Sequence, residues 1–129
     1  MATEHNALLI DDDEVVQKLF TKIGARYGIT MTVAASLEQI KTALENASSF
    51  NIFFVDLILP EITGWEIMKR LKSHPETAGK PVVVLTGAVL SVDEKKNILE
   101  QANAIFEKKS FSLAAFEKIV NQFFPPSVS

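Results

Sequence analysis

The sequence contains no cysteine, so neither disulfide bonds nor thiolate metal ligands are available to this protein. It also lacks any apolar stretch near the roughly 20 residues that span a bilayer, and its first six residues do not form a secretory signal pattern. The formal net charge of −3 gives no general attraction to nucleic acid or to anionic membranes. These absences favour a cytoplasmic protein without membrane insertion and without a direct nucleic-acid partner.

Glycine and proline are scarce, with five of each, and no Asn-Gly or Asp-Gly hairpin signal occurs. Apolar residues make up 47% of the chain and charged residues 22%, an ordinary balance for a globular protein. A chain of 129 residues with this composition is expected to form a single domain over residues 1–129. Its core is expected to cover about residues 6–124, followed by a short tail at 125–129.

Short apolar runs alternate five times with helical patterns. The runs lie at 7–10, 30–34, 50–55, 81–85 and 105–106, and the helical patterns at 14–23, 36–44, 64–71, 91–102 and 113–124. The runs at 50–55 and 81–85 are apolar at nearly every position, which is typical of parallel strands covered by helices on both faces. The chain is therefore predicted to be an α/β protein with a doubly wound sheet of five parallel strands.

Three local signals indicate where helices begin and end. Gly28 is placed to end the first helix, and Ser36 and Gln39 have the spacing of a capping box at the start of the second. Asn103 is predicted to take the left-handed cap position after the fourth helix.

Chemically reactive side chains follow four of the five predicted strands. They are Asp11, Asp12 and Asp13 after the first, Asp56 after the third, Thr86 after the fourth, and Lys108 or Lys109 after the fifth. Ligands of doubly wound sheets bind beyond these carboxyl ends, so the side chains are expected to gather at one edge. Carboxylates that gather repel one another, and an all-oxygen ligand set suits Mg²⁺ or Mn²⁺ better than zinc. A metal, a lysine and a threonine hydroxyl around one aspartate form a site for a phosphoryl group, with aspartate as the nucleophile.

Each of these residues also has a simpler interpretation when taken alone. An aspartate after a strand is most often a turn or helix-capping residue, and Asp13 before Val15 and Val16 fits a helix cap. Thr86 followed by Gly87 is also typical of a turn. The occurrence of such residues at four strand ends together is what favours a site.

Four segments of the chain resemble the receiver domain of two-component response regulators, over about residues 6–124. They are 8–12 (LLIDD), 53–64 (FFVDLILPEITG), 82–87 (VVVLTG) and 106–108 (FEK). The most specific is the pattern Asp-x-x-x-Pro-x-x-x-Gly that begins at Asp56. The resemblance implies the strand order 2-1-3-4-5 and a stand-alone response regulator.

The resemblance also implies roles for individual residues. Asp56 would accept the phosphoryl group, Thr86 would donate a hydrogen bond to it, and the lysine after the fifth strand would pair with it. Asp11, Asp12, Asp56 and the backbone carbonyl of Ile58 would hold Mg²⁺. A sensor histidine kinase or a histidine phosphotransfer protein would be the donor, and an unknown downstream protein the target. Such a protein is not an enzyme in the usual sense, since it catalyses only its own phosphorylation and dephosphorylation.

Spacing distinguishes the two lysines. Receiver domains commonly place the lysine 22 residues after the threonine and 52 after the phosphoacceptor, and both intervals end at Lys108. Lys109 then stands where the family usually has proline, and Ser110 resembles a one-residue insertion. The Lys108–Lys109 bond is predicted to be trans, because a cis bond before a non-proline residue costs about 3–4 kcal/mol. Ile105 occupies the position of the family's switching aromatic residue, so any switch would use backbone movement at 86–90 or another side chain.

Two other functions compete with this interpretation. One is a receiver-like docking module that works without phosphorylation. It is favoured by the lack of an aromatic residue at Ile105 and of a proline at Lys109, and by the extra residue Ser110. Asp11 and Asp13 also resemble the nucleophile and the acid–base of a haloacid-dehalogenase-type phosphatase. Against the phosphatase, no aspartate follows Asp93, whereas such enzymes need a further acidic metal ligand after the lysine.

Overall fold

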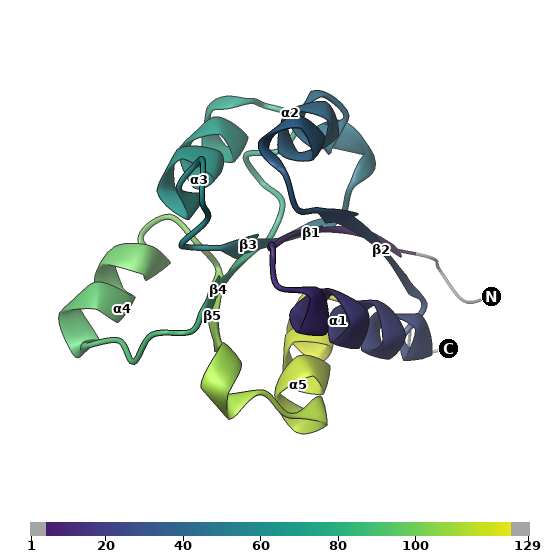
Figure 1. Ribbon diagram of the computed structural model, residues 1–129, viewed down its shortest axis with the longest axis vertical. Helices are drawn as coiled ribbons and strands as arrows, with labels where there is room; N and C mark the ends of the chain where they lie inside the picture. The colour runs from purple at the N-terminus through teal and green to yellow at the C-terminus, as the bar shows by residue number, and fades with distance from the viewer. Residues whose placement is uncertain (1–4, 125–129) are drawn as a thin grey trace.

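In a computed structural model, which describes residues 5–124, five strands form one parallel sheet in the order β2-β1-β3-β4-β5 (Figure 1). The strands are β1 (His5–Ile10), β2 (Ile29–Ala34), β3 (Ile52–Asp56), β4 (Val82–Thr86) and β5 (Ala104–Glu107). Every neighbouring pair in the sheet is parallel. The predicted α/β class, the doubly wound sheet and the strand order are confirmed. The predicted tail at 125–129 lies outside the described residues.

Helices cover both faces of this sheet. They are α1 (Glu14–Arg26), α2 (Leu37–Glu45), α3 (Gly64–Ser73), α4 (Val92–Leu99) and α5 (Leu113–Phe123), with 3₁₀ turns at η1 (Ala47–Ser49) and η2 (Lys108–Ser110). Figure 1 shows α1 and α5 on one side of the sheet and α2, α3 and α4 on the other. None of the helices described between residues 5 and 124 combines the length and the apolar character that crossing a membrane requires.

Two apolar clusters, one on each face, hold the layers together. Every residue of β3 and β4 is buried, as expected for strands with helices on both sides. Under α1 and α5, the ring of Phe20 lies 5.3 Å from that of Phe54 and 5.4 Å from that of Phe116, measured between centroids. Burying each such side chain contributes about 2–3 kcal/mol, so this face strongly constrains where α1 and α5 lie.

The helix ends follow the predicted signals except after α4. Gly28 has a φ of 71°, and Ser36 and Gln39 form the predicted capping box at α2. The prediction for Asn103 is wrong: α4 ends at Leu99 rather than near residue 102, and no non-glycine residue between 5 and 124 has a positive φ. Asn103 instead extends the sheet, because its Oδ1 accepts from Val82 N at 2.9 Å and its N–H donates to Val82 O at 2.8 Å.

After β5, Lys109 and Ser110, which depart from the family pattern, lie in one tight turn. The Lys108–Lys109 bond is trans, as predicted, since the described residues contain no cis peptide bond. The 3₁₀ turn η2 begins at Lys108, and the N–H of Phe111 donates to Lys108 O at 3.3 Å. Ser112 then caps α5 by accepting from Ala115 N at 3.0 Å.

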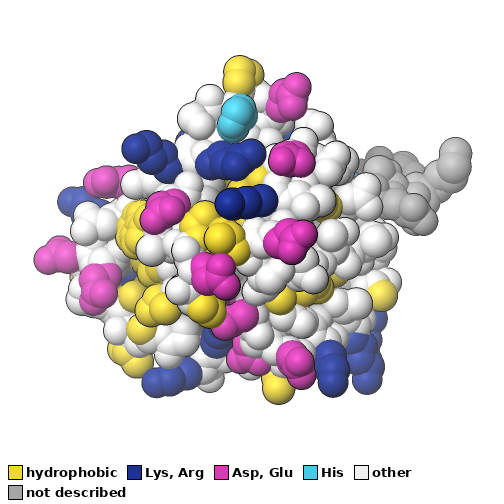
Figure 2. Space-filling model, turned by 45° about the horizontal axis from the view of Figure 1, so that its top comes forward, with side chains coloured by type: hydrophobic (Ala, Val, Ile, Leu, Met, Phe, Trp, Pro, Cys, Tyr) yellow, Lys and Arg dark blue, Asp and Glu magenta, His cyan; other side chains and the backbone are white. Residues whose placement is uncertain are grey.

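Figure 2 shows the side of the molecule that carries α2 and α3, where acidic and basic side chains lie interspersed. This mixture agrees with the small net charge of the chain.

Candidate functional site

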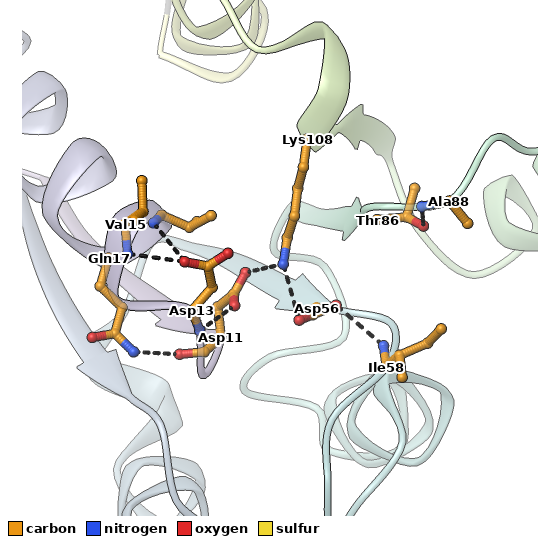
Figure 3. Close-up of polar contacts among 10 residues, drawn as sticks. Asp11, Asp13, Val15, Gln17, Asp56, Ile58, Thr86, Ala88 and Lys108 are labelled. Atoms are coloured by element: carbon orange, nitrogen blue, oxygen red, sulfur yellow. Dashed lines mark hydrogen bonds and ion pairs between the residues drawn. The ribbon is translucent and has the colours of Figure 1, made fainter.

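Asp11 directly follows β1 and is completely buried. Its Oδ1 accepts a hydrogen bond from Asp13 N at 2.9 Å, and its backbone carbonyl accepts one from Gln17 Nε2 at 2.8 Å (Figure 3). Asp13 in turn caps α1, because its Oδ1 accepts from Val15 N at 2.9 Å. Asp13 N thus holds the carboxylate of Asp11, and Gln17 of α1 holds its backbone.

Asp56 is the last residue of β3 and is 5% exposed. Its Oδ1 accepts from Ile58 N at 3.1 Å, which orients the carboxylate against the loop that follows. The loop closes on itself through a bridge between Ile58 and Thr63 and a bond from Gly64 N to Leu57 O at 3.0 Å. A Cβ at Gly64 would lie 2.6 Å from Asp56 O, so only glycine allows α3 to begin this close to Asp56.

Lys108 joins the two buried carboxylates. Its Nζ lies 2.8 Å from Asp11 Oδ2 and 3.1 Å from Asp56 Oδ2, as Figure 3 shows. Lys109, the next residue, is exposed. Of the two lysines that the sequence offers, the structure therefore places Lys108 beside Asp56.

Burial and the mutual contacts of Asp11, Asp56 and Lys108 together set the pKa values of Asp11 and Lys108. Loss of solvent raises the pKa of Asp11, and the neighbouring Lys108 opposes that rise only in part. For Lys108, burial works against the charged form, but the hydrogen bonds and charges of Asp11 and Asp56 outweigh it, so the net pKa is raised. Asp11 is consequently a carboxyl group that holds its proton more tightly than usual, and Lys108 is held firmly as a cation.

The carboxylates offer more negative charge than Lys108 balances. Asp12 is exposed at the mouth of the site, and one oxygen each of Asp11, Asp12 and Asp56 lie within 4.8 Å of one another. Asp11 Oδ2 is fully buried, and its polar partner among the described residues is Lys108 Nζ at 2.8 Å. Three converging carboxylates beside a single ammonium group fit a hard divalent cation such as Mg²⁺ or Mn²⁺.

Among the described residues, the side chain of Thr86 makes its hydrogen bond away from the carboxylates. It ends β4 and is 2% exposed, and its Oγ1 accepts from Ala88 N at 3.1 Å. In Figure 3 its side chain lies apart from Asp56 and Lys108. The structure thus places Thr86 on the neighbouring strand, with its hydroxyl bonded to its own loop.

The interpretation of Asp13 as a helix cap is confirmed. Its Oδ1 accepts from both Val15 N and Val16 N, at 2.9 and 3.4 Å. Gln17 was missed by sequence reasoning, although its amide holds the loop that carries Asp11. The available signal was a polar, uncharged residue among the apolar positions of the first helix.

In metal-free buffer, replacing Asp11 by asparagine is expected to change how stability depends on pH. The raised pKa of folded Asp11 means that its proton stabilises the native state fully below its unfolded value of 3.8, and that this contribution is lost as the pH rises through the folded pKa. Wild type should therefore gain stability relative to Asp11→Asn as the pH falls from 7 toward 4. Urea unfolding in EDTA at several pH values measures the difference, and a difference that stayed constant would contradict the assignment.

Comparison with known proteins agrees with this geometry. Residues 7–121 match the family model described as the response regulator receiver domain. The chain is 28% identical over 123 residues to the aerobic respiration control sensor protein ArcB of Escherichia coli K12, covering 92% of this chain but only 15% of ArcB. It is 25% identical over 119 residues to the polar-differentiation response regulator DivK of Brucella ovis, covering 92% of this chain and 94% of DivK.

A solved structure shares the fold. The receiver domain of the sensor histidine kinase PA1611 from Pseudomonas aeruginosa PAO1, which has a magnesium ion in its active-site cleft, superposes with a TM-score of 0.77. The two are 21% identical, and the match covers 94% of this chain and 98% of that one. With the family model matching most of its length, this chain belongs to the response-regulator receiver domain family.

Proposed function

We propose that this protein accepts a phosphoryl group on Asp56 from a phosphohistidine and signals through altered protein–protein contacts. The donor would be a sensor histidine kinase or a histidine phosphotransfer protein, and the reaction would depend on Mg²⁺ or Mn²⁺. The observation that supports this most is the contact of Lys108 with two buried carboxylates, Asp11 and Asp56, at adjacent strand ends. As a receiver domain the chain is a signalling module, and we infer that it catalyses only its own phosphorylation and dephosphorylation.

The proposed transfer is a displacement at phosphorus. A carboxylate oxygen of Asp56 forms the new P–O bond while the P–N bond to the donor imidazole breaks, and the released nitrogen takes up a proton. Lys108 would turn its N–H groups from the carboxylates to the phosphoryl oxygens, and Thr86 would turn its hydroxyl from Ala88 to a third oxygen. Attack by water on the same phosphorus would return Asp56 to its carboxylate and release phosphate.

A cation is needed because one ammonium group cannot balance three carboxylates and an incoming phosphoryl group. Asp11, Asp12, Asp56 and the backbone carbonyl of Ile58 are the proposed ligands. A bound Mg²⁺ would supply neutralisation of charge on the phosphoryl oxygens. The magnesium ion in the cleft of the PA1611 receiver domain supports the choice of metal.

Labelling of Asp56 tests the proposal directly. Wild-type protein incubated with radiolabelled acetyl phosphate and millimolar Mg²⁺ is expected to incorporate label that hydroxylamine releases, as it does from an acyl phosphate. Asp56→Asn removes the nucleophile and should abolish incorporation. Asp93→Asn, a change on the exposed side of α4, is the matched control and should label as wild type does. Label retained in Asp56→Asn would overturn the proposal.

A Mg²⁺ titration separates this function from a docking module that works without phosphorylation. Trp65 follows Gly64, whose backbone lies against Asp56 O at the start of α3, and Trp65 is 36% exposed, so its fluorescence should respond to a cation at the carboxylates. We expect a saturable change at millimolar Mg²⁺ that needs at least about tenfold more Mg²⁺ in Asp12→Asn, since one ligand is lost. No response in wild type would favour the docking module.

The phosphatase alternative depends on a free Asp13 carboxylate. In the structure that carboxylate accepts two backbone hydrogen bonds at the start of α1, which leaves it poorly placed as an acid–base. Membership of the receiver family likewise favours Asp56 over Asp11 as the nucleophile.

The downstream protein is proposed to bind the surface formed by α4, β5 and α5, as the family resemblance implies. Ile105 on β5 is half-buried and packs against the core, and Lys95 on α4 lies 3.2 Å from Glu107 on β5. Without an aromatic ring at Ile105, movement of the backbone around 86–90 is the proposed route of the switch. Thr86 and Ala88, whose hydrogen bond would have to break, lie at the start of that segment.

A further inference from the structure

Gln17, near the start of α1, contacts both ends of the acidic loop at 11–13. Its side-chain Nε2 donates to Asp11 O at 2.8 Å, as Figure 3 shows, and its backbone N–H donates to Asp13 O at 3.0 Å. A carbonyl oxygen only accepts hydrogen bonds, so the side-chain contact requires the N–H donor of the amide. Asp12 lies between these two carbonyl groups, and both of them are held by the same residue of α1.

The carboxylate of Asp12 has no partner of its own. Asp12 is exposed, and in the described part of the chain its side chain takes part in no hydrogen bond or ion pair. One of its oxygens nevertheless lies within 4.8 Å of oxygens of Asp11 and Asp56. Because peptide groups are planar, the two that flank Asp12 set the direction in which its side chain leaves the backbone. The position of this carboxylate therefore depends on the contacts of those two peptide groups.

Different residues hold the two peptide groups. The peptide after Asp12 carries the N–H of Asp13, which donates to Asp11 Oδ1 at 2.9 Å, a contact within the loop itself. The peptide before Asp12 carries Asp11 O, which accepts from Gln17 Nε2. Only this second contact ties the loop to α1, and α1 is fixed in the core by the buried ring of Phe20. The side chain of Gln17 thus fixes the peptide before Asp12 relative to a rigid helix.

A neutral amide suits this position chemically. A lysine or arginine side chain could also donate to Asp11 O, but its charge would compete with a bound cation for the carboxylates of the site. An ionised glutamate can only accept, so it would repel the carbonyl oxygen instead of holding it. Gln17 donates its hydrogen bond and leaves the negative charge of Asp11, Asp12 and Asp56 available to a divalent cation.

We propose that Gln17 is a positioning residue of the cation site. By fixing the peptide before Asp12, it holds the Asp12 carboxylate toward the oxygens of Asp11 and Asp56 before a cation binds. The inference rests on the cation site of the proposed function. It does not rest on transfer of a phosphoryl group to Asp56, because it concerns binding of the cation alone.

Titration of the full chain with Mn²⁺ tests the role of Gln17, with the paramagnetic resonance signal of free Mn²⁺ as the measure of binding. Gln17→Met removes the donor, keeps an unbranched side chain and preserves helix propensity. It should raise the Kd for Mn²⁺ about tenfold, the usual cost of losing a contact that orients a metal ligand. Gln17→Glu also removes the donor but adds a negative charge near the site. Attraction alone would make this variant bind Mn²⁺ more tightly than wild type, whereas loss of positioning should make it bind more weakly.

A double-mutant cycle tests whether Gln17 acts through Asp12. Once Asp12→Asn has removed that carboxylate, there is no Asp12 ligand left to position. Adding Gln17→Met to Asp12→Asn should therefore change the Kd for Mn²⁺ by less than about twofold, although the same change costs about tenfold in the wild-type background. A general disturbance of the loop would instead weaken binding equally in both backgrounds.

The matched control is Gln39→Met at the start of α2, where the glutamine Oε1 accepts from Ala35 N at 2.8 Å. It makes the same chemical change and also removes a contact between a side chain and the backbone, but it should leave the Kd for Mn²⁺ within about twofold of wild type. Urea unfolding in EDTA checks that each variant is folded.

Three results would overturn the inference alone: a Kd for Gln17→Met within about twofold of wild type, tighter binding by Gln17→Glu, or an equal loss from Gln17→Met in both backgrounds of the cycle. Absence of Mn²⁺ binding by wild type would overturn the cation site of the proposed function and this inference with it. If Mn²⁺ binds as expected but Asp56 takes no label from acetyl phosphate, the proposed phosphoryl transfer fails and the role of Gln17 stands.

Discussion

Gly64→Ala is expected to lower the free energy of unfolding by about 3 kcal/mol. The added Cβ would lie 2.6 Å from Asp56 O and 2.7 Å from Leu57 Cα, well inside van der Waals contact. Both neighbours are backbone atoms, so neither can rotate away as a flexible side chain could. Relief requires α3 to move away from β3, which disturbs the buried start of α3 and the loop that orients Asp56.

Urea denaturation measures this loss, and Gly79→Ala is the matched control. A Cβ at Gly79 meets no atom within 4 Å, so that variant should stay within about 0.5 kcal/mol of wild type. We also expect Gly64→Ala to label more slowly with acetyl phosphate, because the carboxylate of Asp56 would no longer be held by Ile58 N. If both glycine variants were equally stable, the close approach of α3 to Asp56 would be wrong.

Lys108→Met is expected to destabilise the metal-free protein by about 3 kcal/mol at pH 7, because it leaves two buried carboxylates facing each other without a cation. Methionine keeps most of the apolar stem, so the loss reports the charge more than the packing. Protonation of Asp11 relieves the repulsion, and the deficit should therefore shrink as the pH is lowered. Added Mg²⁺ should recover part of the stability by the same reasoning, since a bound cation replaces the missing charge.

The control is Lys109→Met, the exposed neighbour, which should stay within about 0.5 kcal/mol of wild type. Urea unfolding in EDTA and in Mg²⁺ measures the free energy of unfolding of both variants and of wild type. Equal stability of the Lys108 and Lys109 variants in EDTA would show that the contacts of Lys108 with Asp11 and Asp56 contribute nothing. A deficit in Lys108→Met that Mg²⁺ did not reduce would argue against a cation at these carboxylates.

Lys109 and Ser110 differ from the usual family pattern, yet Lys108 still contacts Asp56. η2 places the extra residue in a 3₁₀ turn, and Phe111 still reaches Phe106 and Phe20. The same turn leaves Lys108 on the side of Asp56, where its Nζ lies 3.1 Å from Oδ2. The position of Lys108 therefore does not require a proline after it.

The sequence by itself determined the order of elements and the residues at the strand ends. Apolar runs such as 81–85 and the helical spacing of Phe20 and Ile23 depend only on local periodicity, which each segment carries within itself. Strand ends could be recognised because an abrupt change from apolar to charged residues, as at Asp11 and Asp56, marks where a buried strand reaches the surface. The choice of Lys108 over Lys109 rested instead on the intervals from Thr86 and Asp56 that are usual in the family.

Tertiary structure alone decided how these residues meet. The contact of Lys108 with Asp11 and Asp56 joins residues up to 97 positions apart, and its geometry depends on strand register that no local pattern encodes. Asn103 shows the same limit, since pairing with Val82 outweighed its local preference for a left-handed cap. The nearness of Gly64 to Asp56 likewise arises from the packing of α3 against the end of β3, and that packing sets what the site can bind.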